Sequence, residues 1–160
     1  MPIAKGDRLP DATLVKATSE GPVPVTTAEL FGGRTVVLFS VPGAFTPTCS
    51  AKHLPGFVEK AADFAARGVD EIACLAVNDA FVMGAWGASA GAHGKVTMLA
   101  DGNGEFTTAL GLDMDASKYG MGKRGQRFAM VVRNGVVDQL FVEEPGAFHV
   151  SSAEHVLSQL

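Results

Sequence analysis

The sequence is poor in cysteine and in charge, and this scarcity excludes several classes of protein. Two cysteines among 160 residues are too few for the disulfide framework of a small secreted protein, so a reducing, cytoplasmic compartment is expected. A formal net charge of −4 gives no electrostatic support for binding nucleic acid. No apolar run approaches membrane-spanning length, and charged residues stand where a signal peptide would be apolar. We therefore expect neither a nucleic-acid nor a membrane partner.

The patterns of metal and phosphate sites are missing as well. The four histidines are scattered, and none has the spacing to Cys or Asp that metal ligands show. The glycine-rich stretches 84–94 and 120–125 lack the Lys-Ser/Thr pair of a phosphate-binding loop. No cofactor and no metal are expected.

The overall composition is typical of a globular protein, with 47% hydrophobic and 19% charged residues. At this length the chain can bury a core without metal or disulfide support, which predicts a single domain over residues 1–160. The apolar content is slightly high for a monomer. It favours a chain that covers part of its surface with a second copy of itself.

Strand and helix patterns alternate along the chain. The expected strands are 13–16, 23–26, 35–40, 72–77, 96–99, 128–133 and 136–142. Helices are expected in four places: after residue 49, over 80–90, from the turn at 101–104 to about 110, and from a capping box at 151–154 to the end. The last two strands flank Asn134-Gly135, a strong hairpin signal. This order predicts an α/β protein, a three-layer α/β/α sandwich with a mixed central sheet and an N-terminal hairpin.

The segment Pro42–Ser50, which reads Pro-Gly-Ala-Phe-Thr-Pro-Thr-Cys-Ser, is the most informative in the chain. It connects an apolar strand to a helical pattern, so Cys49 is expected in the first turn of a helix. Unpaired N–H groups and the helix dipole favour the thiolate there, which is the reactive form. A free cysteine is more often a small buried hydrophobe, but the neighbours of Cys49 are small and polar. The pattern indicates a nucleophile, with the Thr46 hydroxyl facing the same cavity.

Three of these residues, Pro42, Thr46 and Cys49, match the Pro-x-x-x-Thr-x-x-Cys signature of the peroxiredoxins. The whole segment resembles the type II, peroxiredoxin-five-like subgroup. Three later blocks resemble the same family in the same order: 68–83, 99–104 and 126–132. The resemblance covers essentially the whole chain. It implies a thioredoxin-like fold and a thiol peroxidase that reduces hydrogen peroxide or organic hydroperoxides through a sulfenic acid at Cys49.

The resemblance also implies roles for individual residues. Arg127 would stabilise the thiolate of Cys49 and the charge that develops on the peroxide oxygens. Thr46 would orient the peroxide, and Pro42 would shield the thiolate from water. Without the family match, Arg127 would be interpreted as an exposed strand-edge residue, and the nearby Arg124 is expected in solvent.

The sequence does not decide the role of Cys74, and the type of catalytic cycle depends on that role. Its apolar strand favours an inert core thiol, whereas a resolving cysteine would need its Cα within about 7 Å of that of Cys49. Some members of the subgroup carry a resolving cysteine near the carboxyl terminus, and the segment 146–151 contains none. We therefore expect a one-cysteine cycle in which an accessible Cys49 meets an external thiol. The resemblance suggests glutathione with glutaredoxin first and thioredoxin second; the two-cysteine cycle with Cys74 and thioredoxin remains the alternative.

Two other functions compete with a peroxidase. A disulfide reductase would need a Cys-x-x-Cys pair, and Thr46 occupies the first of those positions. A peroxide sensor would share the chemistry of Cys49 but show little turnover. His53, four residues after Cys49, is expected at the surface or in packing rather than as a base.

Large apolar side chains stand among the glycines and small residues of two segments. Phe45, Phe81, Met83 and Trp86 are expected in the core by default. The resemblance suggests that some of them line a homodimer face beside the active site.

Overall fold

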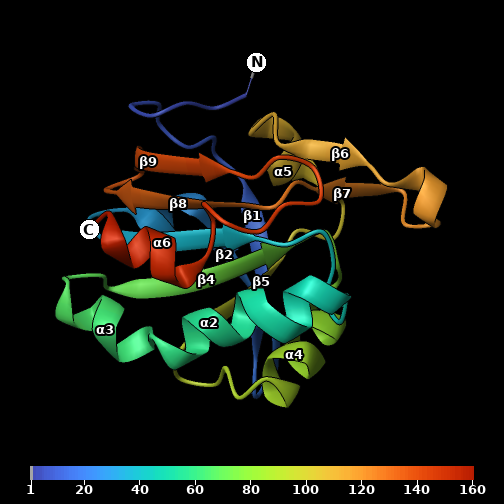
Figure 1. Ribbon diagram of the computed structural model, residues 1–160, viewed down its shortest axis with the longest axis horizontal. Coiled ribbons are helices and arrows are strands. Elements are labelled where there is room, and N and C mark those ends of the chain that lie inside the picture. Colours follow the sequence, from blue (N-terminus) through green and yellow to red (C-terminus); the bar gives the residue numbers. More distant parts are fainter. Residues whose placement is uncertain (1) are drawn as a thin grey trace.

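The computed structural model describes residues 2–160, and a seven-stranded sheet forms its centre (Figure 1). The strand order is β2-β1-β5-β4-β3-β8-β9. The pairs β3–β4 and β4–β5 are parallel and the others are antiparallel, so the sheet is mixed. The strands are β1 (Thr13–Thr18), β2 (Gly21–Thr26), β3 (Thr35–Ser40), β4 (Glu71–Ala76), β5 (Thr97–Ala100), β8 (Phe128–Arg133) and β9 (Val136–Val142).

A second, two-stranded hairpin projects from the body of the molecule (Figure 1). It consists of β6 (Asp113–Asp115) and β7 (Lys123–Gly125), with the short 3₁₀ helix η2 (Ser117–Tyr119) between them. The other helices are α1 (Thr27–Phe31), the π-helix η1 (Cys49–His53), α2 (Leu54–Glu59), α3 (Ala61–Ala66), α4 (Ala80–Ser89), α5 (Glu105–Ala109) and α6 (Ala153–Ser158). No helix within residues 2–160 is long and apolar enough to cross a membrane.

Helices cover both faces of the central sheet because successive side chains of a strand point to opposite faces. Alternate residues of β3 and β4 contribute to two separate cores. One core contains Phe39 and Cys74 and is closed by α2, α3, α4 and α6. The other contains Leu38 and Leu75 and is closed by α1 and α5. The expected three-layer α/β/α sandwich with an N-terminal hairpin, here β1–β2, is confirmed.

Local signals predict the β8–β9 hairpin turn and the start of α4 correctly, but they place the cap of the closing helix at the wrong residue. Asn134 and Gly135 have φ values of 50° and 77° and connect β8 to β9 as a tight hairpin. Asp79 caps α4 by accepting a hydrogen bond from the Val82 N–H. The closing helix begins one residue later than expected, because the Ser152 side chain, not that of Ser151, caps it.

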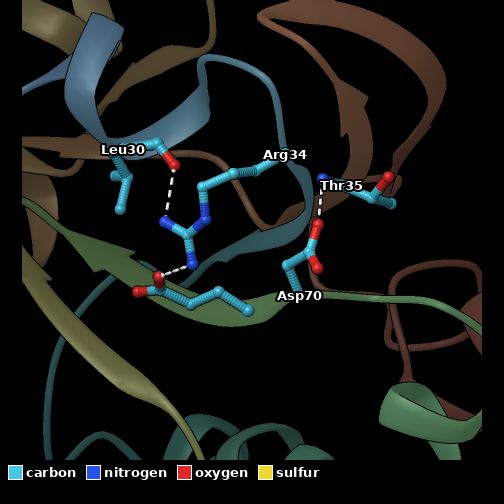
Figure 2. Close-up of polar contacts among 5 residues, drawn as sticks. Leu30, Arg34, Thr35 and Asp70 are labelled. Atoms are coloured by element: carbon cyan, nitrogen blue, oxygen red, sulfur yellow. Dashed lines mark hydrogen bonds and ion pairs between the residues drawn. The ribbon is translucent and has the colours of Figure 1, made fainter.

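The amino ends of β3 and β4 are connected by polar contacts (Figure 2). The Arg34 guanidinium donates to the Leu30 carbonyl and pairs with Glu71. The Asp70 carboxylate accepts a hydrogen bond from the Thr35 N–H at 2.8 Å. These contacts fix two adjacent parallel strands at one end. The cysteine-containing loop leaves β3 at the opposite end.

Candidate active site

The loop between β3 and η1, residues 41–48, is held by hydrogen bonds at both ends. The Ala44 N–H donates to the Asn78 side chain at 2.9 Å, and Asn78 follows directly after the β4 region. The Thr46 hydroxyl donates to the Gly43 carbonyl at 2.7 Å, and the Ser50 N–H donates to the Thr46 carbonyl at 2.9 Å. Because the Thr46 proton is used inside the loop, the lone pairs of its hydroxyl are left to accept from a ligand.

Cys49 begins a π-helix rather than an α-helix, in which the Leu54 N–H donates to the Cys49 carbonyl. Such segments are rare and occur frequently at functional sites. The expectation of an accessible thiol is wrong, because Cys49 has no exposed surface and belongs to the core between the sheet and α2. In this conformation the sulfur is therefore shielded from solvent.

Arg127 lies directly beside this thiol. It precedes β8, and the antiparallel register of β3 and β8 pairs Ser40 with Phe128, so Arg127 lies next to the end of β3. Its Nη2 donates a hydrogen bond to the Cys49 Sγ at 3.0 Å. A permanently charged guanidinium at this distance stabilises negative charge on the sulfur during a reaction. The sheet register thus brings together two residues far apart in the sequence.

His53 takes part in the site in a way that the sequence did not predict. Its Nδ1 lies 2.7 Å from Arg127 Nη1, and its Nε2 lies 2.9 Å from the Ser151 carbonyl oxygen. A guanidinium can only donate, so Nδ1 accepts and the proton is on Nε2, which donates to Ser151. Burial, and then the charge of Arg127, lower the pKa of His53 to about 3. His53 is therefore a neutral acceptor that orients Arg127.

Pro42 is half-buried at the start of the loop, and a second arginine contacts it. Arg124 donates from Nε to the Met121 carbonyl at 2.9 Å and from Nη1 to the Pro42 carbonyl at 3.4 Å. A Cβ atom on Gly43 would lie 3.0 Å from Arg124 Nη1, so the side chain packs closely on this turn. The expectation that Arg124 lies free in solvent is wrong, because the β6–β7 hairpin turns it back onto the loop.

Cys74 lies in the middle of β4 and is fully buried. Both cysteines are free thiols, and both belong to the core that α2 and α4 cover. Burial, and then the nearby Cys49, raise the pKa of Cys74 well above its usual value. The Cys74 thiol is therefore protonated and unreactive in this conformation.

The large apolar side chains near the loop divide into two groups. Met83 and Trp86 are buried, as expected, and the Trp86 indole donates to the Ser50 hydroxyl at 3.0 Å. Phe45 and Phe81 are 55% and 74% exposed, so the expectation of core positions is wrong for them. Phe45 also has a φ of 63°, a strained conformation for a bulky residue, and this turns its ring outward.

Arg127 thus brings a fixed cation to the sulfur of Cys49, and the Thr46 hydroxyl in the preceding loop keeps lone pairs that can accept a hydrogen bond. Within residues 2–160, no three Cys, His, Asp or Glu side chains are grouped to hold a metal ion. The chemistry that these groups support is attack by sulfur on an electrophile whose leaving group becomes negative.

Comparison with known sequences places this site in a family. The Redoxin family model matches residues 4–157. Peroxiredoxin-2E-2, chloroplastic, of Oryza sativa subsp. japonica is 56% identical, with 99% of this chain and 72% of that protein covered. Peroxiredoxin-2B of Arabidopsis thaliana is 46% identical, with 99% of both chains covered.

Comparison with solved structures points to the same family. Reduced Prx3 of Vibrio vulnificus in complex with hydrogen peroxide superposes with a TM-score of 0.94 at 54% identity, over 98% of both chains. Peroxiredoxin 5 of Alvinella pompejana gives a TM-score of 0.85 at 36% identity, over 98% of this chain and 97% of that one. The expected thioredoxin-like fold is thereby confirmed. The chain belongs to the peroxiredoxin family, within its type II, peroxiredoxin-five-like group, and is a thiol peroxidase.

Proposed function

We propose that this peroxidase reduces hydrogen peroxide and organic hydroperoxides by a one-cysteine cycle, recycled by glutathione with glutaredoxin. The hydrogen bond between Arg127 Nη2 and Cys49 Sγ supports the first half-reaction. The thiolate attacks one peroxide oxygen, an S–O bond forms, the O–O bond breaks, and the departing hydroxide or alkoxide takes up a proton. Cys49 is thereby oxidised to a sulfenic acid and the peroxide is reduced to water or an alcohol. The homologous Prx3 of Vibrio vulnificus binds hydrogen peroxide, which supports this substrate.

The surrounding residues take the roles that their contacts allow. Arg127 stabilises the thiolate and the charge on the departing oxygen, because its guanidinium is fixed by His53 and cannot lose its proton. Thr46 accepts a hydrogen bond from the peroxide through its free lone pairs. We assign Pro42, at the start of the same loop, the role of shielding the thiolate from water, as the family signature implies.

The second half-reaction uses a thiol from outside the chain. A first thiol attacks the sulfenic sulfur, forming a mixed disulfide and releasing water. A second thiol then attacks the mixed disulfide, which releases Cys49 as a thiol and the two external thiols as a disulfide. Cys74 is a poor partner, because it is buried in a central strand and its thiol is protonated. The segment Glu143–Ser151 beside the site contains no cysteine. The burial of Cys49 means that the π-helix and the loop before it open to admit the thiol.

Replacing Cys74 tests this cycle. Cys74→Ser is expected to keep steady-state peroxidase activity within about twofold when glutathione and glutaredoxin are supplied, because the buried thiol takes no part. Parallel assays with glutathione–glutaredoxin and with thioredoxin identify the reductant. A peroxide sensor would instead consume about one equivalent of peroxide and stop.

Mass spectrometry after one equivalent of peroxide, without added thiol, separates the two cycles. A sulfenic or over-oxidised Cys49 supports the one-cysteine cycle. A quantitative intramolecular disulfide between Cys49 and Cys74 would overturn it and assign the resolving role to Cys74, with thioredoxin as the expected reductant.

We also propose a homodimer whose interface includes the amino end of α4 and the loop before η1. Phe81 at the start of α4 and Phe45 in the loop are exposed, and the Phe45 ring lies 6.5 Å from that of Trp86 in α4. The loop that carries Phe45 therefore packs against α4, the helix whose first turn carries Phe81. Aromatic side chains in such positions are enriched at the centres of protein interfaces.

A negative charge at position 81 is expected to dissociate the dimer into monomers. Phe81→Asp should shift the protein to monomer in sedimentation velocity at tens of micromolar, because a carboxylate would be buried without a partner. Tyr119→Asp is the matched control, since Tyr119 is 71% exposed but lies in the β6–β7 hairpin. A wild-type protein that sediments only as a monomer would contradict the proposal.

A further inference from the structure

Glu143, at the end of β9, is a mostly buried carboxylate that binds the loop after it. Only 8% of its surface is exposed. One oxygen, Oε2, accepts three hydrogen bonds: from the His149 N–H at 2.7 Å, the Ser151 N–H at 2.8 Å and the Ser151 hydroxyl at 2.7 Å. The main chain of Glu143 is also bound, because its N–H donates to the Arg127 carbonyl at 3.0 Å. Glu143 thus connects the backbone of Arg127 to Ser151.

Ser151 is connected to the Cys49 sulfur by a series of side-chain hydrogen bonds. Its carbonyl accepts from His53 Nε2 at 2.9 Å, and His53 Nδ1 accepts from Arg127 Nη1 at 2.7 Å. The other terminal nitrogen of Arg127 donates to the Cys49 Sγ at 3.0 Å. The contacts therefore form a closed circuit that runs from Arg127 through Glu143, Ser151 and His53 back to Arg127.

The same loop also covers the arginine. Phe148 directly precedes His149, whose N–H donates to Glu143, and its ring meets the ring of His53 edge-on at 5.1 Å. The Arg127 guanidinium carbon lies 5.9 Å from the centre of the Phe148 ring. A loop displaced from Glu143 would carry away both the carbonyl that fixes His53 and the ring beside Arg127.

The carboxylate of Glu143 forms no ion pair with a basic side chain of the described residues. The ion pairs among residues 2–160 are Arg34–Glu71 and Arg133–Asp138, and Glu143 is in neither. Burial alone would raise the pKa of Glu143, but the hydrogen bonds from Ser151 and His149 outweigh it and lower that pKa. The carboxylate is therefore ionised at neutral pH, which makes its hydrogen bonds to the loop the strong, charge-assisted kind.

We propose that Glu143 is a positioning residue of the peroxidase, which holds the loop 143–151 so that Ser151 and His53 orient the Arg127 guanidinium toward Cys49. Glu143 touches no reacting atom and acts through His53 and Arg127. The inference rests on the proposed role of Arg127 in stabilising the thiolate. Residues that orient a primary site residue typically contribute about 10- to 100-fold in activity, as at metal centres.

The test compares Glu143→Ala and Glu143→Gln with Glu144→Gln, a neighbouring exposed glutamate without a side-chain hydrogen bond in the structure. The rate of reaction with hydrogen peroxide can be followed by the fluorescence of Trp86, the only tryptophan, whose indole contacts Ser50 beside Cys49. Glu143→Ala is expected to slow this reaction about tenfold or more. Glu143→Gln, which keeps a neutral acceptor, should lose less, and Glu144→Gln should stay within about twofold of wild type.

A second readout separates positioning from mere stability and needs no peroxidase activity. The rate of alkylation of Cys49 by iodoacetamide is measured against pH in the Cys74→Ser background. In Glu143→Ala, the midpoint of this profile should move to higher pH, because a misdirected guanidinium stabilises the thiolate less. A variant that unfolds at lower temperature but keeps the wild-type rate and profile would overturn the proposal.

A double-mutant cycle with Arg127→Gln tests the route of action. Arg127→Gln alone is expected to slow the peroxide reaction by about 10²-fold, a typical loss for one electrostatic donor. If Glu143 acts through Arg127, Glu143→Ala should cost nothing further in that background. Additive losses would overturn the proposed route. An Arg127→Gln protein with wild-type rates would instead contradict the role of Arg127 itself, so the two failures are distinguishable.

Discussion

Cys49→Ser is expected to lose at least about 10³-fold of its peroxide-reducing activity, the scale of removing a catalytic nucleophile. The reason is chemical rather than structural. Serine has nearly the shape of cysteine, but its hydroxyl is a much weaker nucleophile than the thiol that Arg127 contacts at 3.0 Å. Peroxide consumption in the presence of glutathione and glutaredoxin is the measurement.

Cys74→Ser is the matched control, because it makes the same atomic change at the other fully buried cysteine. Circular dichroism should show that both variants fold, since neither thiol is part of a disulfide. Turnover of Cys49→Ser within tenfold of wild type would contradict the assignment of the nucleophile.

The parts of the fold and site that could be predicted have local causes. The apolar strand at 35–40, the Asn134-Gly135 turn and the helix start at residue 80 each depend on neighbouring residues, and the structure contains all three. The thiol and its loop could be found because the signature occupies eight consecutive positions. Short elements with weak patterns, such as α1 and the β6–β7 hairpin, were not predicted.

Contacts between residues distant in the sequence could not be predicted. His53 contacts Arg127, 74 residues away, and Ser151, 98 residues away. Its only local signal is its position four residues after Cys49, which a surface histidine could share. Glu143 gave no signal at all, because a glutamate at the end of a strand is usually exposed. The burial of Cys49 likewise follows from packing against the sheet and could not be inferred from its small polar neighbours.

The buried imidazole of His53 has a consequence for stability in acid. Burial and the charge of Arg127 lower its pKa in the folded protein from the ordinary value of 6.5 to about 3. Between these two pH values the unfolded chain binds a proton at this site that the folded chain does not bind. Stability therefore falls as the pH falls through this window. Glu143, whose pKa is also lowered, acts in the same direction, but only below its ordinary value of 4.5.

Urea unfolding between pH 6.5 and 4.5 should therefore isolate the contribution of His53. The free energy of unfolding is expected to fall by about 1.4 kcal/mol for each pH unit once the unfolded histidine is fully protonated, a large fraction of the total for a domain of this size. His53→Gln should flatten this slope, because glutamine does not titrate yet offers both an acceptor to Arg127 and a donor to Ser151. His93→Gln, at an exposed position, should keep the wild-type slope. If His53→Gln and wild type lose stability in parallel across this window, His53 is not held neutral in the folded protein, and its assignment as the acceptor that orients Arg127 is wrong.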